Sequence, residues 1–156
     1  MAETYFRITN TVALLAWIAL LIFPGRRWVS GWLCATLVPG ALAASYAAVI
    51  GWRLLAGNDL PEDLTTLDGL RAGFSDDWVM AAAWTHYLAF DMVVGAWIAR
   101  DAIRVGVPAL ARVPALALTF LLGPAGYLLY LVVRGTQGGG LRVDDGRTAP
   151  AASDTV

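Results

Sequence analysis

The sequence predicts an all-α integral membrane protein, a four-helix bundle, and three observations lead to that prediction. Apolar residues make up 58% of the 156 residues, whereas about 45–50% is usual in a soluble domain. Charged residues make up only 15%, against about 25% in soluble domains. The apolar residues also gather into four long runs. A soluble chain of this length cannot bury so much apolar surface, so we expect it to lie in a lipid bilayer.

Each apolar run is long enough to cross a membrane as a helix. At a rise of about 1.5 Å per residue, about 20 residues cross a hydrocarbon core of about 30 Å. Backbone polar groups in lipid must be paired within their own segment, which favours helices. The expected spans are residues 5–23, 28–52, 78–98 and 113–133.

The long loop between the second and third spans carries its own signals. Leucine recurs at helical spacing over residues 60–70, with carboxylates between, which predicts a short amphipathic helix on the membrane surface. Ser75 precedes Asp76 and Asp77, so we expect the Ser75 hydroxyl to cap the third span.

The chain divides into two parts by composition. Residues 1–134 form the predicted four-helix transmembrane domain, because all four apolar runs lie there. Residues 135–156 begin with glycines and continue as a polar mixture that lacks apolar residues for packing. We therefore predict a disordered C-terminal tail.

The second and fourth spans contain helix-breaking residues near their middles. Pro39 and Gly40 interrupt the second span, and the sequence GPAG over residues 123–126 interrupts the fourth. Proline removes a backbone hydrogen bond and kinks a helix, so we predict kinks in both spans. Interrupted helices in two halves of a chain point to a binding site near the membrane midplane. The alternative is that small residues here only permit close helix packing.

Reactive and charged residues exclude several classes of protein. The eleven cations are all arginines and the net charge is −1, so nothing favours nucleic acid as a partner. Without lysine there is no retinal or pyridoxal Schiff base and no P-loop. The only cysteine, Cys34, and the only histidine, His86, are too few for a thiolate metal cage or for both axial ligands of a haem within one subunit. We therefore expect no metal and no other cofactor.

The third span carries an imidazole and a carboxyl. Asp91 lies near its middle, where inserting a carboxylate costs about 2.5–3.5 kcal/mol, so it marks a functional site by default. His86 lies five residues earlier, about 140° away around the helix at about 100° per residue, and the two cannot share one face. We predict that both are catalytic residues that move protons around a buried ligand. The alternative is hydrogen bonding that only fixes helix packing.

Depth along the spans gives candidate ligand-binding residues. Counted from each span's midpoint at about 1.5 Å per residue, two threonines come level with Asp91 and four polar residues with His86. Two further tyrosines lie one turn before Asp91 and after the break in the fourth span. The predicted ligand-binding residues are Asn10, Thr36, Ser45, Tyr46, Tyr87, Thr119, Tyr127 and Tyr130.

Arginines near the span ends bear on orientation. Four spans place both termini on one side, and five arginines occupy the two short loops on the other side, at positions 26, 27, 100, 104 and 112. Cytoplasmic loops carry the excess of arginine, so we expect both termini outside the cytoplasm. Arg100 and Asp101 are expected to form a solvated pair at the membrane interface. The lysine-free, alanine-, glycine- and arginine-rich composition indicates a bacterial inner membrane.

Two stretches of the chain carry a distinctive pattern, WTHYLAFD at residues 84–91 and LTFLLGPAGYLLY at residues 118–130. Both resemble the abscisic-acid-deficient-four-like family of four-helix membrane proteins, and the likeness extends over about residues 5–134. Plant members are needed for neoxanthin formation in plastids, so the resemblance implies a carotenoid or related isoprenoid ligand.

The resemblance also implies a type of chemistry. Conversion of violaxanthin to neoxanthin is an isomerisation in which an epoxide opens and an allene forms. An acid must protonate the epoxide oxygen and a base must remove a carbon-bound proton, with no redox cofactor. His86 and Asp91 match the family motif and are the candidates for these roles.

Three functions follow as hypotheses. The first is an enzyme, or an enzyme component, that binds or isomerises a carotenoid or isoprenoid. The second is a small proton-linked carrier in which Asp91 is the proton site. The third is a non-catalytic scaffold that positions another membrane enzyme. The partners expected are the lipid bilayer, such a ligand, and either a second copy of the chain or a membrane enzyme.

Overall fold

The computed structural model describes residues 1–57 and 65–137, and every regular element within them is a helix. The all-α prediction is thus confirmed. Three helices are long and apolar enough to cross a membrane, and they coincide with the first three expected spans. In chain order the elements are α1 (Ala2–Ile22), the π-helix η1 (Trp28–Leu37), α2 (Val38–Leu55), α3 (Leu67–Phe74), α4 (Asp77–Val105), α5 (Ala109–Leu122) and α6 (Pro124–Thr136).

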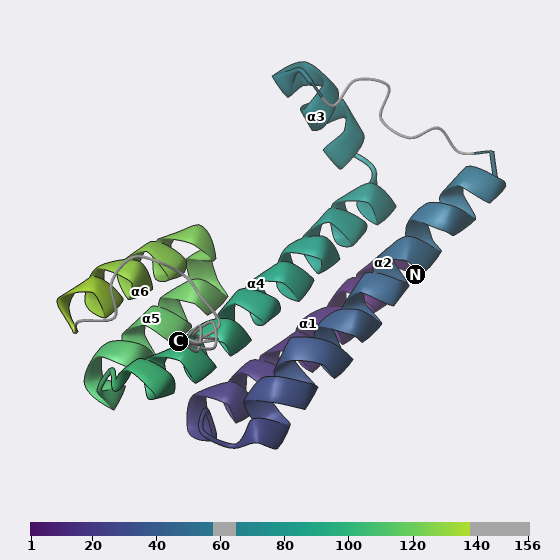
Figure 1. Ribbon diagram of the computed structural model, residues 1–156. Helices are drawn as coiled ribbons and strands as arrows, with labels where there is room; N and C mark the ends of the chain where they lie inside the picture. The colour runs from purple at the N-terminus through teal and green to yellow at the C-terminus, as the bar shows by residue number, and fades with distance from the viewer. Residues whose placement is uncertain (58–64, 138–156) are drawn as a thin grey trace, which may run out of the picture.

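Helix α4 lies at the centre and contacts every other element (Figure 1). Small residues on α4 let its neighbours approach closely. The clearest case is Gly95, because a side chain there would collide with the indole of Trp17, which is only 1% exposed. Close approach at small residues is how helices associate in lipid, where burying apolar surface gives little gain.

The second span is continuous but changes its hydrogen bonding. The chain is π-helical up to Leu37 and α-helical from Val38. Pro39 lies in the first turn of α2, where its missing N–H interrupts no bond within that helix. The change from π-helical to α-helical bonding thus lies just before Pro39, and Pro39 and Gly40 themselves lie in regular α-helix. A bend of the helix axis there stays a prediction.

The fourth span is not a single membrane crossing, and that part of the four-helix prediction is wrong. Gly123, with φ +34°, separates α5 from α6, and the two helices pack against each other as an antiparallel hairpin (Figure 1). Their close approach depends on Gly126, where any side chain would collide with the backbone of Thr119. At about 1.5 Å per residue, each arm is about 20 Å long, too short for a core of about 30 Å.

The hairpin also changes where the chain ends. Near the N-terminus, the Tyr5 ring lies 5.9 Å from that of Trp78, at the start of α4. Near the end of α6, Arg134 forms an ion pair with Asp101 at 2.7 Å, close to the end of α4. The two ends of the described chain therefore lie at opposite ends of α4. The expectation that they share one side is wrong, because it assumed four crossings.

The predicted surface helix is present as α3, but it begins at Leu67, and residues 60–64 of its predicted range lie outside the described residues. Most of the predicted tail, residues 138–156, lies outside them too. Thr66 caps α3 by accepting the N–H of Gly69 at 3.2 Å.

The cap of α4 is Asp76, and the expectation of Ser75 is wrong. Asp76 Oδ1 accepts the N–H groups of Trp78 at 2.8 Å and Val79 at 3.1 Å, whereas the Ser75 hydroxyl donates back to Ala72 O. A carboxylate satisfies two free N–H groups and complements the positive end of the helix dipole, which a hydroxyl does less well. Asp76 Oδ2 also pairs with buried Arg53 at 3.0 Å and so ties the end of α2 to the start of α4.

We expect this contact to make stability depend on pH. Burial alone would raise the pKa of Asp76, but the N–H groups of Val79 and Trp78 and the Arg53 guanidinium outweigh it and hold the pKa below its ordinary value. The contribution is therefore complete above about pH 4, the ordinary carboxyl value, and is lost as the pH falls through the lower folded-state pKa. Asp76→Asn should lower Tm in detergent near neutral pH, and the difference should shrink in acid.

The matched control is Asp77→Asn, which removes the neighbouring exposed carboxylate and should leave the pH profile unchanged. A Tm difference between Asp76→Asn and the unsubstituted protein that stays constant down to acid pH would contradict the assignment.

Candidate functional site

Asp91 lies at the tip of the hairpin. It is the central residue of α4, and Gly123, which joins α5 to α6, lies directly against its carboxyl. A Cβ atom on Gly123 would come within 2.5 Å of Asp91 Oδ1. Glycine is thus required here twice, by its positive φ and by the carboxyl that occupies the space of a side chain. The hairpin therefore reaches the middle of α4 and turns back there.

From Asp91 towards its C-terminal end, α4 is covered by the hairpin. The rings of Tyr127 and Tyr130 lie 5.8 and 5.4 Å from that of Trp97. Tyr130 also donates to Asp101 Oδ2 at 2.5 Å. Ile98 and Asp101, on this side of α4, are 0% and 4% exposed.

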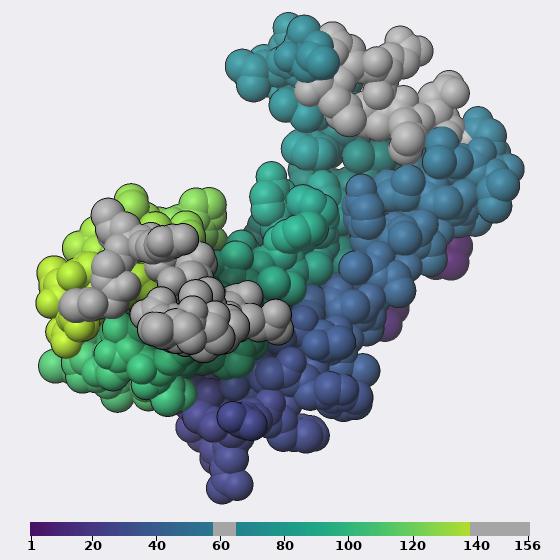
Figure 2. All heavy atoms as spheres, viewed as in Figure 1, coloured from purple at the N-terminus to yellow at the C-terminus, as the bar shows by residue number. Residues whose placement is uncertain are grey.

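From Asp91 towards its N-terminal end, the same side of α4 is uncovered. Ala83, Tyr87 and Phe90 follow each other at spacings of four and three residues, so they share one face; we call it the uncovered face. Tyr87 is 57% exposed and Phe90 61%. Figure 2 shows this part of α4 lying open between the hairpin and α3. The site is thus an aromatic helix surface that ends at a carboxyl.

His86 borders the uncovered face on the side of α2. Its ring lies 4.7 Å from that of Phe90 and 5.8 Å from that of Tyr87. It also lies 5.9 Å from the ring of Tyr46 on α2. His86 and Asp91 do not come together, since one faces these aromatic rings and the other faces Gly123.

Of the predicted binding residues, Tyr46 and Tyr87 lie beside His86, and the others lie elsewhere. Asn10 accepts the indole N–H of Trp84 at 3.0 Å. Ser45 bonds the Tyr5 hydroxyl at 3.2 Å.

The two threonines bond within their own helices. The hydroxyls of Thr36 and Thr119 donate to Gly31 O and Ala115 O, at 3.4 and 2.8 Å. Thr119 is also the residue whose backbone lies against Gly126 in the hairpin.

Tyr127 lies on the far side of the hairpin tip from His86, packed on Trp97. Its predicted level beside His86 is therefore wrong, because the depth count assumed a straight fourth helix.

A buried ionic cluster was missed by the sequence reasoning. Asp101 accepts from Tyr130 at 2.5 Å, from Arg134 at 2.7 Å and from Arg104. The side chains of Asp101 and Arg134 are each 3% exposed, so the expectation of a solvated Arg100–Asp101 pair is wrong. Arg100 donates instead to Ser30 O. The available signal was the four-residue spacing of Tyr130 and Arg134, which places both on one face of α6.

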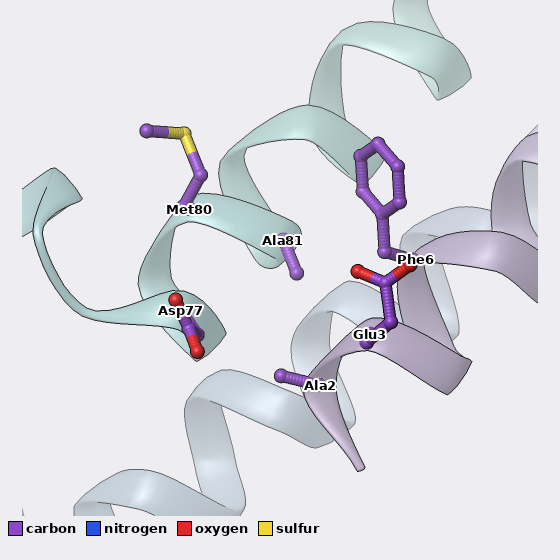
Figure 3. Close-up of a pocket in the computed structure, with 6 residues that line it drawn as sticks. All are labelled: Ala2, Glu3, Phe6, Asp77, Met80 and Ala81. Atoms are coloured by element: carbon purple, nitrogen blue, oxygen red, sulfur yellow. The ribbon is translucent and has the colours of Figure 1, made fainter.

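A separate pocket of about 240 Å³ lies between the starts of α1 and α4 (Figure 3). Glu3 and Phe6 come from α1, whereas Asp77 and Met80 come from α4. Glu3 is paired with Arg7 at 2.6 Å. The pocket contains no predicted site residue. Within residues 1–57 and 65–137, no three His, Cys, Asp or Glu side chains gather as a metal site would require.

Comparison with known protein families shows a similarity. The family model ABA4-like, described as ABA DEFICIENT 4-like, matches residues 4–130, a stretch that holds His86, Asp91 and the hairpin tip. No curated protein and no solved structure matches the chain.

Proposed function

Because the chain belongs to the ABA DEFICIENT 4-like family, we propose that it is a multi-pass membrane protein that binds a carotenoid or related isoprenoid on the uncovered face of α4. The observation that carries the proposal is the row of half-buried Ala83 and exposed Tyr87 and Phe90, which ends at Asp91. Aromatic rings offer flat apolar surface to an unsaturated chain. A carboxyl in the middle of an apolar helix can hydrogen-bond an oxygen carried by such a chain and so fix its position.

The two candidate catalytic residues act on different parts of one ligand. They are five residues apart, which is about 7.5 Å along the axis and about 140° around it. Asp91 lies at the end of the uncovered face and His86 along its edge, so a ligand on this face passes both. An isomerisation needs one group to donate a proton to an oxygen and the other to accept a proton from carbon, with no net redox change. His86 and Asp91 together supply that pair.

The first test is the content of the purified protein. Absorbance and mass spectrometry of protein in mild detergent should reveal a bound polyene or isoprenoid, and added retinol should quench tryptophan fluorescence. Asp91→Asn should reduce the bound amount, whereas Asp77→Asn, at the exposed start of α4, should not. Protein that carries no such lipid and does not bind retinol would refute the proposal.

Catalysis is tested separately from binding. His86→Ala and Asp91→Asn should each abolish turnover of the identified ligand. If both variants turn it over normally, the acid–base assignment fails. Binding without turnover in the unsubstituted protein would favour the scaffold function, in which the protein presents the ligand to another membrane enzyme.

A further inference from the structure

The hairpin covers one half of α4 and leaves the other half accessible to a ligand. Between Ala83 and Asp91 the uncovered face extends about 12 Å along the helix, at about 1.5 Å per residue. That is within one half of a hydrocarbon core of about 30 Å. Beyond Asp91 the same side of α4 lies beneath Tyr127 and Tyr130. A ligand that reaches Asp91 along α4 therefore has a free path on one side and a packed hairpin on the other.

The two ends of the molecule differ in charge. We call the end of α4 that lies beneath the hairpin the covered end. Among the described residues it carries only one carboxylate, Asp101, which is buried and paired with Arg104 and Arg134. The opposite end carries Glu3, Asp68, Asp76 and Asp77 beside its arginines. The other arginines of the covered end are Arg26, Arg27, Arg100 and Arg112.

Arginine excess marks the cytoplasmic side of a membrane protein. The covered end then faces the cytoplasm, and the N-terminus lies outside.

Resting on the proposed function, we propose that the site is loaded only from the leaflet at the N-terminal, carboxylate-rich end. The ligand is an amphiphilic isoprenoid whose head group stays at that surface while its chain follows Tyr87 and Phe90 to Asp91. A chain that enters from the covered end, where most of the arginines lie, meets the hairpin before it reaches Asp91. To pass, it has to separate Tyr130 and Arg134 from Asp101 and Tyr127 from Trp97.

The test uses the full chain in sealed vesicles and a probe that stays in one leaflet. The probe is farnesyl phosphate with a photoreactive group at the end of its chain, because the phosphate prevents rapid exchange between leaflets. Vesicles are sorted by the accessibility of an N-terminal epitope. We expect labelling of α4 around Tyr87–Asp91 when the probe is added on the N-terminal side, and loss of labelling when it is added on the arginine side.

Two variants in which tryptophan replaces an alanine test whether the probe binds at the uncovered face. Ala83→Trp fills that face and should abolish labelling. Ala48→Trp adds the same side chain at an exposed position on α2 and should leave labelling intact.

Detergent-solubilised protein distinguishes the two ways in which the idea can fail. Suppose that the protein is labelled in detergent. If labelling in vesicles is then equal from both sides, occurs from the arginine side alone, or is absent, the one-sided access is overturned and the proposed function still stands. No labelling in detergent, together with no retinol binding, overturns both.

Discussion

Asp101→Asn is expected to destabilise the folded protein by about 3–5 kcal/mol, the usual cost of removing one partner from a buried ion pair. The variant removes the Asp101 carboxylate from Arg134, whose side chain is 3% exposed. It also weakens the acceptor for Tyr130. Because this cluster joins the end of α6 to α4, the hairpin should separate first. Unfolding in detergent, followed by tryptophan fluorescence, measures the loss.

Two comparisons isolate the buried charge as the cause. Asp68→Asn breaks the ion pair with Arg71, in which both side chains are at least 75% exposed, and should cost less than about 1 kcal/mol. The double variant Asp101→Leu with Arg134→Met removes both buried charges and should recover much of the loss. A double variant as unstable as Asp101→Asn would show that loss of the Asp101 charge beside Arg134 is not responsible.

Gly126→Val is expected to open the hairpin. Its side chain would collide with the backbone of Thr119, which cannot rotate away as a side chain can, so the two helices must move apart. We expect a destabilisation near 3 kcal/mol, about the upper end of the usual range for overpacking. Gly123 should then leave Asp91, and retinol binding should weaken with it.

The control for Gly126→Val places valine one residue earlier. Ala125 is exposed, so Ala125→Val adds a similar apolar side chain to the same helix without the collision, and Tm should stay near that of the unsubstituted protein. Equal losses in the two variants would mean that valine in the first turn of α6, rather than contact with Thr119, causes the effect.

Continuous helices could be predicted from the sequence, and so could one tertiary contact. Apolar runs fix the three long helices because length and hydropathy are local properties. Counting depth from their midpoints placed Tyr46 level with His86, and the two rings are in contact. The depth count was correct here because the helix is unbroken from Tyr46 to the end of α2 and from His86 to the start of α4.

The hairpin could not be predicted by the same reasoning. Proline and glycine at residues 123–126 show where backbone hydrogen bonding stops, but not the direction in which the chain continues. That direction depends on the positive φ of Gly123 and on the fit of Gly126 against Thr119. Once the chain turns back, every depth counted beyond Gly123 is reversed, which is why Tyr127 was misplaced. Asp101 was misread for a related reason, since its partner Arg134 lies 33 residues away.

The hairpin has a consequence for how the protein is made. Neither α5 nor α6 is long enough to be released into the bilayer as a crossing segment, and at the tip the N–H groups of Ala125 and Gly126 precede the first bond of α6, which Tyr127 N–H donates to Gly123 O. The three long helices can enter the membrane one after another during synthesis. The hairpin is a local structure that forms quickly from neighbouring residues, but its buried arginine needs Asp101 already in place. Assembly therefore proceeds in order, and Asp91 gains its contact with Gly123 last, when the hairpin docks on a finished α4.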